Sequence, residues 1–435
     1  MAWLDELFAR MVTEGASDLH LTSGLAPRFR LHGEILEVPG SAPIDDVSLR
    51  AVLYEISPEQ NRRQFEKEND TDFAYELPGK ARFRANFFVD RNGPGAVFRQ
   101  IPVNILSAEQ LGLPPAVLDL CKLSKGLVLV TGPTGSGKST TLAAMIDHIN
   151  STRTDHVITI EDPIEFVHPT KRCLINQREV HRHTESFKRA LRAALREDPD
   201  IILVGEMRDL ETIEIAIETA ETGHLVFGTL HTTTAPSTVD RIIDQFPADR
   251  QAQIRTMLAN SLKGVVAQTL CKKQPKGRVA ALEILITNTA VAANIREGKT
   301  HQIVSAMQMG AKHGMRLLND SLLEHVRAGT VEPDEAYFRA VNKDDMRGKL
   351  ESIGAKLDLA VESGEGGAPQ GQAQAQTAGA HAAPHVQSAP RAPLPTRAGG
   401  PSSGIPPAPT QAPGSAQAPA KGWSDPFDAF KKKRT

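Results

Sequence analysis

The chain has 435 residues, enough for two or three domains, and its 50 basic and 52 acidic residues give a formal net charge of −2. This balance excludes a general electrostatic attraction to nucleic acid or to an anionic membrane surface. The three cysteines lack the C-x-x-C spacing of a zinc knuckle, and no stretch approaches the roughly 18 apolar residues of a membrane-spanning helix. We therefore expect a cytoplasmic protein without a nucleic-acid partner.

The first 105 residues are predicted to form a compact α+β domain. Apolar side chains recur at helical spacing over residues 2–14, which predicts an amphipathic helix that packs on a core. Short runs of alternating polarity, separated by glycine and proline, predict a small sheet. Its strands are expected at 18–21, 28–31, 35–38, 71–76, 81–89 and 96–101, with helices at 45–56 and 59–68.

Four arginines lie on or beside the last two of these strands: Arg82, Arg84, Arg91 and Arg99. One interpretation is a solvated basic face, because exposed charges on a sheet need no partner. The alternative is that one or two of them bind a phosphate, since the planar guanidinium group can donate two hydrogen bonds to phosphate oxygens. An arginine that reaches a nucleotide from another domain or subunit can stabilise the charge of the transition state.

A linker at 106–120 leads to a glycine-rich segment that begins at Gly126. Its core, Gly132-Pro133-Thr134-Gly135-Ser136-Gly137-Lys138-Ser139 followed by Thr140, matches the G-x-x-x-x-G-K-[ST] phosphate loop between a predicted strand and helix. The glycines let backbone N–H groups turn toward one concave anion site. Lys138 is expected to reach the β- and γ-phosphates of ATP, and the Ser139 hydroxyl is expected to bind Mg²⁺.

Beyond the phosphate loop, apolar strands alternate with helices, which predicts an α/β domain over 121–355 whose parallel sheet is covered on both faces. Strands are expected at 157–161, 201–204, 225–230 and 279–285, and helices at 139–150, 186–196, 210–222 and 239–246. The last part of this domain is predicted to be helical, with helices at 248–270, 289–297, 300–309 and 315–327.

Two carboxylates end predicted strands of this domain. Glu206 follows the apolar strand at 201–204 after one glycine, which is the Walker B arrangement that places an acid beside Mg²⁺. Glu161 ends the strand at 157–161 and can align the attacking water as a general base. Both lie at the carboxyl ends of strands, where open α/β sheets bind ligands.

Two histidines, His224 and His231, bracket the predicted strand at 225–230. A histidine at a strand end near phosphate can sense the γ-phosphate, whereas many histidines in such places are structural. The residues alone leave both roles open.

The composition changes near Val361 to alanine, proline, glycine, glutamine and serine, which together bury too little apolar surface to fold. We therefore expect residues 356–435 to be a disordered tail. Its end combines aromatic residues, Trp423 to Phe430, with the basic run from Lys431 to Arg434. This end is either a binding peptide, for an unknown partner or for a lipid headgroup, or a solvated terminus.

Four segments together resemble the secretion ATPase superfamily: the phosphate loop, Ile158–His168, Ala193–Asp209 and Gly223–His231. Within that superfamily the chain resembles the PilT-type twitching-motility ATPases, which retract type IV pili. The resemblance covers roughly residues 1–350. It implies a PAS-like domain at 1–105 and a RecA-like domain after it, in a homohexamer with ATP between protomers. It also implies an inner-membrane pilus platform protein as partner, through which the motor associates peripherally with the membrane.

The resemblance implies roles for individual residues as well. Glu161 matches the catalytic glutamate of the acidic box, and Glu206 matches the Walker B acid. The histidine-box pair corresponds to His224 and His231. The arginines that the family supplies from its N-terminal domain correspond to Arg84 and Arg99, with Arg82 in reserve.

One motif departs from the PilT-type pattern. The family's Ala-Ile-Arg-Asn-Leu-Ile-Arg-Glu box, which retraction requires, is recognisable only in its second half at 289–297. An accessory paralogue, or a pilus-assembly or type II secretion ATPase, therefore stays an alternative. A nucleic-acid translocase is less favoured because the charge is balanced. A non-catalytic adaptor is also less favoured, because Lys138, Glu161 and Glu206 are all present.

Overall fold

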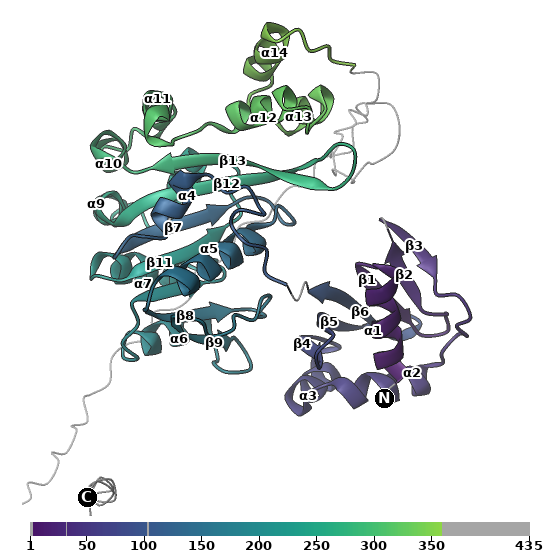
Figure 1. The fold of residues 1–435 in the computed structure, drawn as a ribbon. Coiled ribbons are helices and arrows are strands. Elements are labelled where there is room, and N and C mark those ends of the chain that lie inside the picture. The colour runs from purple at the N-terminus through teal and green to yellow at the C-terminus, as the bar shows by residue number, and fades with distance from the viewer. Residues whose placement is uncertain (1–2, 32, 102–103, 359–435) are drawn as a thin grey trace, which may run out of the picture. The chain divides into compact units, whose positions relative to one another are not determined.

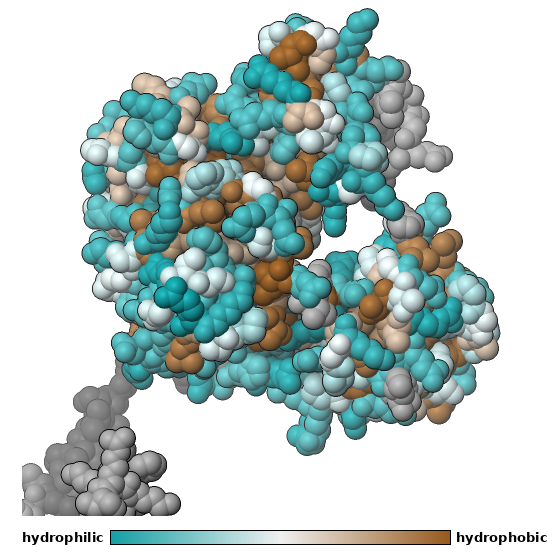
Figure 2. All heavy atoms as spheres, in the orientation of Figure 1, coloured by the Kyte–Doolittle hydropathy of each residue, from teal (hydrophilic) through white to brown (hydrophobic). Residues whose placement is uncertain are grey.

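The computed structural model describes residues 3–31, 33–101 and 104–358 (Figure 1). Two sheets organise these residues, one of six strands and one of seven. The predicted disordered tail lies outside the described residues from Leu359 onward. Among the described helices, every one is too short or too polar to cross a membrane. The face drawn in Figure 2 is largely hydrophilic, with hydrophobic residues in smaller groups.

The first sheet is antiparallel and has the strand order β3-β2-β1-β6-β5-β4. Its strands are β1 (Asp18–Thr22), β2 (Arg28–Leu31), β3 (Glu34–Glu37), β4 (Asp70–Leu77), β5 (Ala81–Asp90) and β6 (Gly93–Ile101). Three helices accompany it: α1 (Trp3–Glu14), α2 (Asp46–Ile56) and α3 (Glu59–Glu68). The predicted α+β content of this part is confirmed.

Aromatic packing explains why α1 forms on this sheet. Phe8 of α1 stacks on Phe83 of β5 with ring centroids 4.3 Å apart and meets Phe98 of β6 edge to face. Leu4 and Met11 lie on the same helix face and are fully buried. The apolar face predicted for residues 2–14 therefore packs on the sheet.

The second sheet has the order β13-β12-β7-β11-β10-β8-β9. Its strands are β7 (Gly126–Thr131), β8 (His156–Glu161), β9 (Leu174–Glu179), β10 (Ile201–Val204), β11 (Leu225–Leu230), β12 (Leu262–Lys272) and β13 (Arg278–Ile286). Neighbouring strands are parallel except β12 and β13, which form an antiparallel hairpin. This mixed, mainly parallel sheet has the RecA-like arrangement and confirms the predicted α/β class.

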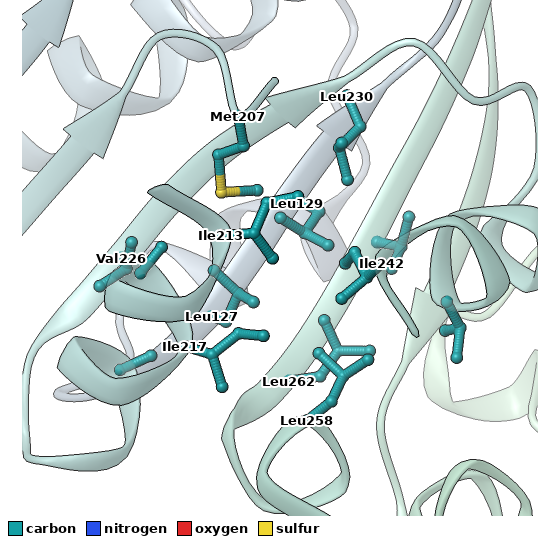
Figure 3. Packing of buried hydrophobic residues seen from close by; sticks show 14 of the residues in the cluster. Leu127, Leu129, Met207, Ile213, Ile217, Val226, Leu230, Ile242, Leu258 and Leu262 are labelled. Carbon is teal, nitrogen blue, oxygen red and sulfur yellow. The ribbon is translucent and has the colours of Figure 1, made fainter. Parts of the chain in front are cut away.

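Helices cover both faces of the second sheet. They are α4 (Pro115–Leu120), α5 (Lys138–Thr152), α6 (Phe187–Ala194), α7 (Leu210–Glu221), α8 (Ala235–Asp244), α9 (Gln251–Ser261), α10 (Thr289–Arg296) and α11 (Ile303–Met309). Successive side chains of β7 point to opposite faces. Leu127 and Leu129 pack with residues of α7, α8 and α9 on one face (Figure 3). Val128 and Val130 pack with residues of α4 and α5 on the other face.

Three C-terminal helices form a smaller core on the β12–β13 hairpin. They are α12 (Leu318–Arg327), α13 (Pro333–Arg339) and α14 (Lys343–Ser352). Cys271 of β12 and Ala281 of β13 are fully buried among their apolar side chains. The predicted helical end of the chain is confirmed in this part.

Two sequence predictions near this hairpin were wrong. The helix predicted at 248–270 ends at Ser261, and the chain continues as β12, because the run from Gly264 to Gln268 is buried between β7 and β13. The strand predicted at 279–285 is present, but it runs antiparallel to its neighbour. The edge strand β9 was not predicted, since its residues are mostly polar.

Candidate active site

The phosphate loop connects the end of β7 at Thr131 to the start of α5 at Lys138. Gly132, Gly135 and Gly137 have φ angles of 145°, 78° and 87°, in the region that favours glycine. A Cβ atom on Gly132 would lie 2.3 Å from the carbonyl oxygen of Gln268, so no larger residue fits there. The loop therefore turns tightly into the N-terminus of α5, where backbone N–H groups can bind phosphate.

The ammonium group of Lys138 lies over this loop. Its Nζ donates to the carbonyl oxygens of Gly132 at 2.8 Å and Pro133 at 3.2 Å. Burial lowers the pKa of Lys138, while the carboxylates of Glu206 and Glu165 act in the opposite direction. The ammonium group is thus held by neutral carbonyl oxygens, which phosphate oxygens can replace.

Gln268 of β12 braces the phosphate loop from the neighbouring strand. Its side-chain Nε2 donates to the carbonyl oxygen of Ser136, and its Oε1 accepts a hydrogen bond of 2.8 Å from the Thr141 hydroxyl. Gln268 is only 3% exposed, so both ends of its amide are committed to the loop and α5.

Glu161 lies at the carboxyl end of β8. Its Oε1 accepts hydrogen bonds from the Thr159 hydroxyl at 2.6 Å and from Gln177 Nε2 at 3.1 Å. Burial raises the pKa of Glu161 to about 7, although these two donors and the backbone N–H of Glu165 favour the ionised form. A carboxylate whose pKa lies near neutrality is well matched to accept a proton from water.

Glu206 follows β10 after one residue, Gly205. Its Oε1 forms an ion pair with Arg208 Nε at 2.6 Å and lies 2.7 Å from His231 Nε2. Burial alone would raise the pKa of Glu206, but the hydrogen bonds and charges of these two partners outweigh it and lower that pKa. Glu206 is therefore ionised at neutral pH, as a carboxylate ligand of Mg²⁺ must be.

These groups line one cavity of about 240 Å³. Most of the predicted site residues are among its lining: Thr134, Gly135, Lys138, Ser139, Glu161, Glu206, His231 and Arg84. His224 is not, because it precedes β11 while His231 follows it, so the two histidines lie at opposite ends of one strand. Its Nδ1 contacts the carbonyl oxygen of Thr219 instead, at 3.2 Å.

The three predicted arginines have different partners in the structure. Arg84 and Arg99 face each other on β5 and β6. Arg84 lines the cavity and, among the described residues, forms one long ion pair, 3.4 Å, with Asp72. Arg99 pairs with the buried carboxylate of Asp18 at 2.7 Å and is absent from the lining. Arg82, in contrast, donates to Glu179 at 3.0 Å.

The chain matches the family model described as type II/IV secretion system protein over residues 1–338. It belongs to this family. The type IV pilus retraction ATPase PilT of Pseudomonas aeruginosa is 52% identical over 337 residues, which cover 78% of this chain and 98% of that protein. A twitching motility protein of Neisseria gonorrhoeae is 49% identical over 340 residues, 76% of this chain and 90% of that protein.

A solved structure of the pilus retraction motor PilT with bound ADP has a TM-score of 0.74 and 45% sequence identity to this chain. The match covers 79% of this chain and 98% of that one. Together with the curated relatives, it shows that the chain is a PilT-type member of the secretion ATPase family.

In this PilT-type chain, three residues of the site were missed by sequence analysis. Gln268 and Gln177 hold the phosphate loop and Glu161 from adjacent strands, and Arg208 holds Glu206. A polar residue inside the apolar run of β12 is a signal that could have indicated Gln268. Arg208 lies in the same motif as Glu206, but only the fold shows that it turns back to that carboxylate.

Proposed function

We propose that the chain hydrolyses ATP to ADP and phosphate and that this reaction drives the retraction of type IV pili. The observation that carries the proposal is the cavity in which Lys138, Glu161 and Glu206 meet. ATP hydrolysis needs a phosphate site, a metal ligand and a group that activates water in one place. The similarity to pilus retraction motors over almost their full length supports the choice of process.

In the proposed mechanism, Lys138 exchanges its two carbonyl partners for phosphate oxygens when the triphosphate binds to the loop. Ser139 and Glu206 would hold Mg²⁺, which supplies positive charge to the phosphate oxygens; both residues line the cavity and offer the oxygen donors that Mg²⁺ prefers. Glu161 then accepts a proton from the attacking water.

Arginine and histidine residues are proposed to act on the γ-phosphate side of this reaction. Arg84 is the candidate for stabilising transition-state charge, because it lines the cavity and, among the described residues, forms one ion pair of 3.4 Å with Asp72. His231 is the candidate for sensing the γ-phosphate through its contact with Glu206. For Arg99 and His224, the same roles require contacts that this structure does not form.

We also infer a homohexamer that acts on an inner-membrane pilus platform protein and lies peripherally at the cytoplasmic side of that membrane. Membership of the PilT-type group supports this inference. A motor that withdraws a pilus has to act against a partner fixed in the membrane.

One feature favours a second candidate, an accessory paralogue or an assembly ATPase. The stretch at 289–297 matches only half of the retraction box, and it forms α10 with Val291 and Ile295 fully buried. Arg296 and Glu297, which belong to the recognisable half, are exposed. The function of the chain in its cell therefore has to be tested together with its enzymatic activity.

The test is a deletion of the gene, complemented with the wild-type chain, with Lys138→Ala or with Lys125→Ala. Lys125 is an exposed lysine just before β7 and serves as the matched control. We expect the deletion strain to carry many surface pili and to lose surface motility. The wild-type chain and Lys125→Ala should restore motility, and Lys138→Ala should not, because it removes the charge that binds phosphate.

Two results would contradict the proposal. Pili that are absent from the deletion strain would indicate an assembly ATPase. Normal ATP hydrolysis by purified Lys138→Ala protein would show that the cavity is not the hydrolytic site.

A further inference from the structure

Gln177 lies in the middle of β9 and joins Glu161 to one wall of the cavity. Its Nε2 donates to Glu161 Oε1 at 3.1 Å and to the carbonyl oxygen of Phe166 at 2.8 Å. Its Oε1 accepts the backbone N–H of His168 at 2.7 Å. One side-chain amide therefore makes three contacts with the segment Ile158–His168, whereas Gln177 itself lies outside the motifs identified in the sequence.

The register of two parallel strands explains why these side chains meet. Thr159 on β8 is paired with Gln177 on β9, and Glu161 is two residues beyond Thr159. Residues two apart on a strand face the same side of the sheet. Thr159, Glu161 and Gln177 therefore project from one face, where two donors bind the same oxygen of Glu161 and fix the orientation of its carboxyl group.

The segment from Asp162 to His168 lies over this face and forms part of the cavity wall. Gln177 binds it at Phe166 and His168, and Glu179, two residues further along β9, accepts the backbone N–H of Ile164 at 3.1 Å. Gln177 thus contacts both Glu161 and the segment from Asp162 to His168 that follows it.

We propose that Gln177 is a positioning residue for ATP hydrolysis, which orients the carboxyl group of Glu161 toward the bound nucleotide and stabilises its ionised form. The proposal rests on the proposed role of Glu161 as the base. Gln177 itself does not line the cavity, so it acts through Glu161 and the wall segment and not on the substrate.

Charged groups around Glu161 act on its ionisation as well. Glu165 raises its pKa, while the hydrogen bonds from Thr159 and Gln177 lower it against the larger effect of burial. The other titratable groups that line the cavity are Lys138, Asp162, His168, Glu206, Arg208, His231 and Arg84. Removal of the Gln177 donor leaves these groups in place, so its effect on the pH dependence can be measured separately.

The test compares the pH profile of kcat for the full-length wild-type chain, Gln177→Met and Asn176→Met. Methionine has a similar length but cannot donate a hydrogen bond. Asn176 is the preceding residue on β9, and its Oδ1 contacts His156 Nε2 on the opposite face, so Asn176→Met is the matched control. For Gln177→Met we expect kcat to fall about tenfold, with the KM for ATP within about twofold of the wild-type value.

The acid limb of the profile should also move. Loss of a donor to the carboxylate favours the protonated form of Glu161, so the limb should shift to higher pH by roughly 0.5 to 1 unit in Gln177→Met and stay in place in Asn176→Met. A merely structural role would lower kcat without moving the limb. A limb that coincides with the wild-type limb, or an equal shift in Asn176→Met, would overturn the proposal.

Two further variants keep the result interpretable. If Gln177→Met does not fold, Gln177→Glu replaces it. This variant retains the acceptor for the backbone N–H of His168, and its negative charge should also move the acid limb of the kcat profile to higher pH. An unmoved acid limb in this variant counts against the proposal.

Glu161→Gln tests the underlying assignment of Glu161 as the base. If Glu161→Gln hydrolyses ATP normally, the base assignment fails and the role of Gln177 fails with it. If Glu161→Gln is inactive and the Gln177 variants match the wild type, only the positioning role fails.

Discussion

The pKa of Glu161, the proposed base, is shifted in opposite directions by its burial and by its hydrogen bonds. Burial raises its pKa from 4.5 to about 7, and the hydrogen bonds from Thr159 and Gln177 keep that rise from being larger. Glu206 has the opposite outcome, since Arg208 and His231 lower its pKa. Two carboxylates in one cavity are thereby separated into a proton acceptor and a permanent anion.

Glu161→Gln is expected to retain nucleotide binding and to slow hydrolysis by about 100-fold or more, because the shape of the side chain is preserved and the base is lost. It should also stabilise the fold at alkaline pH. The folded-state pKa of Glu161 is raised, so its contribution to stability is present below about pH 4.5 and is lost as the pH rises through about 7.

The measurement is thermal unfolding without nucleotide at pH 5 and pH 8. The difference in Tm between Glu161→Gln and the wild type should be larger at pH 8. Glu221→Gln, at an exposed glutamate of α7, serves as the control and should show no such change. Equal differences at the two pH values would contradict the raised pKa.

At this scale, motifs predicted the charged groups that line the cavity but not the groups that hold them. Lys138, Glu161 and Glu206 follow from local sequence, because each lies in a short pattern at the end of a strand. Gln177 and Gln268 act from adjacent strands that are distant in sequence, so their contacts exist only after the sheet has formed. The ion pair that engages Arg99, while its cross-strand neighbour Arg84 lines the cavity, likewise depends on Asp18, which lies on a third strand.

Among the elements, β12 contacts the phosphate loop through both its backbone and a side chain. Its backbone comes so close to Gly132 that only glycine fits, and its Gln268 binds both Ser136 and Thr141. The strand lies directly beside β7, whose end begins the loop. The conformation of the loop is therefore set by the neighbouring strand as well as by its own glycines.

Gln268→Leu tests this dependence. The change removes two hydrogen bonds and leaves the Ser136 carbonyl and the Thr141 hydroxyl buried without their partner. We expect the Kd for ADP to rise by about 5- to 30-fold, because each lost hydrogen bond makes the free energy of ADP binding less favourable by about 1 kcal/mol. Binding of a fluorescent ADP analogue measures the effect, with the exposed Gln253→Leu on α9 as control. An unchanged Kd would show that the loop keeps its conformation without the brace.

Elements with strong periodicity and clear ends were predictable, and those defined by their neighbours were not. The helix predicted at 59–68 and the strand predicted at 201–204 match the structure residue for residue. A proline marks the start of the helix, and a buried apolar run defines the strand. The apolar run at 262–272 fits a buried helix as well as a buried strand, and pairing with β7 and β13 decides between them. The polar edge strand β9 carries no periodic signal at all.

At the scale of the whole molecule, the described cores and the cavity are complete before the C-terminal tail. The smallest core, on the β12–β13 hairpin, extends to Leu357, and every cavity residue precedes it. A chain that ends at Asp358 is therefore expected to hydrolyse ATP with a kcat within about twofold of the full-length value. Steady-state hydrolysis and Tm of the two chains check this. A large loss of either would show that residues beyond 358 support the fold or the site.

The β12–β13 hairpin connects two parts of the molecule that would otherwise be distant from each other. Gln268 on β12 holds the phosphate loop, and Leu282, its partner on β13, donates its backbone N–H to Ser321 of α12 at 3.0 Å. Cys271, three residues beyond Gln268, is buried in the core of the C-terminal helices. The phosphate loop and the C-terminal helices therefore contact the same hairpin, so the position of the loop depends on a strand pair that those helices also hold.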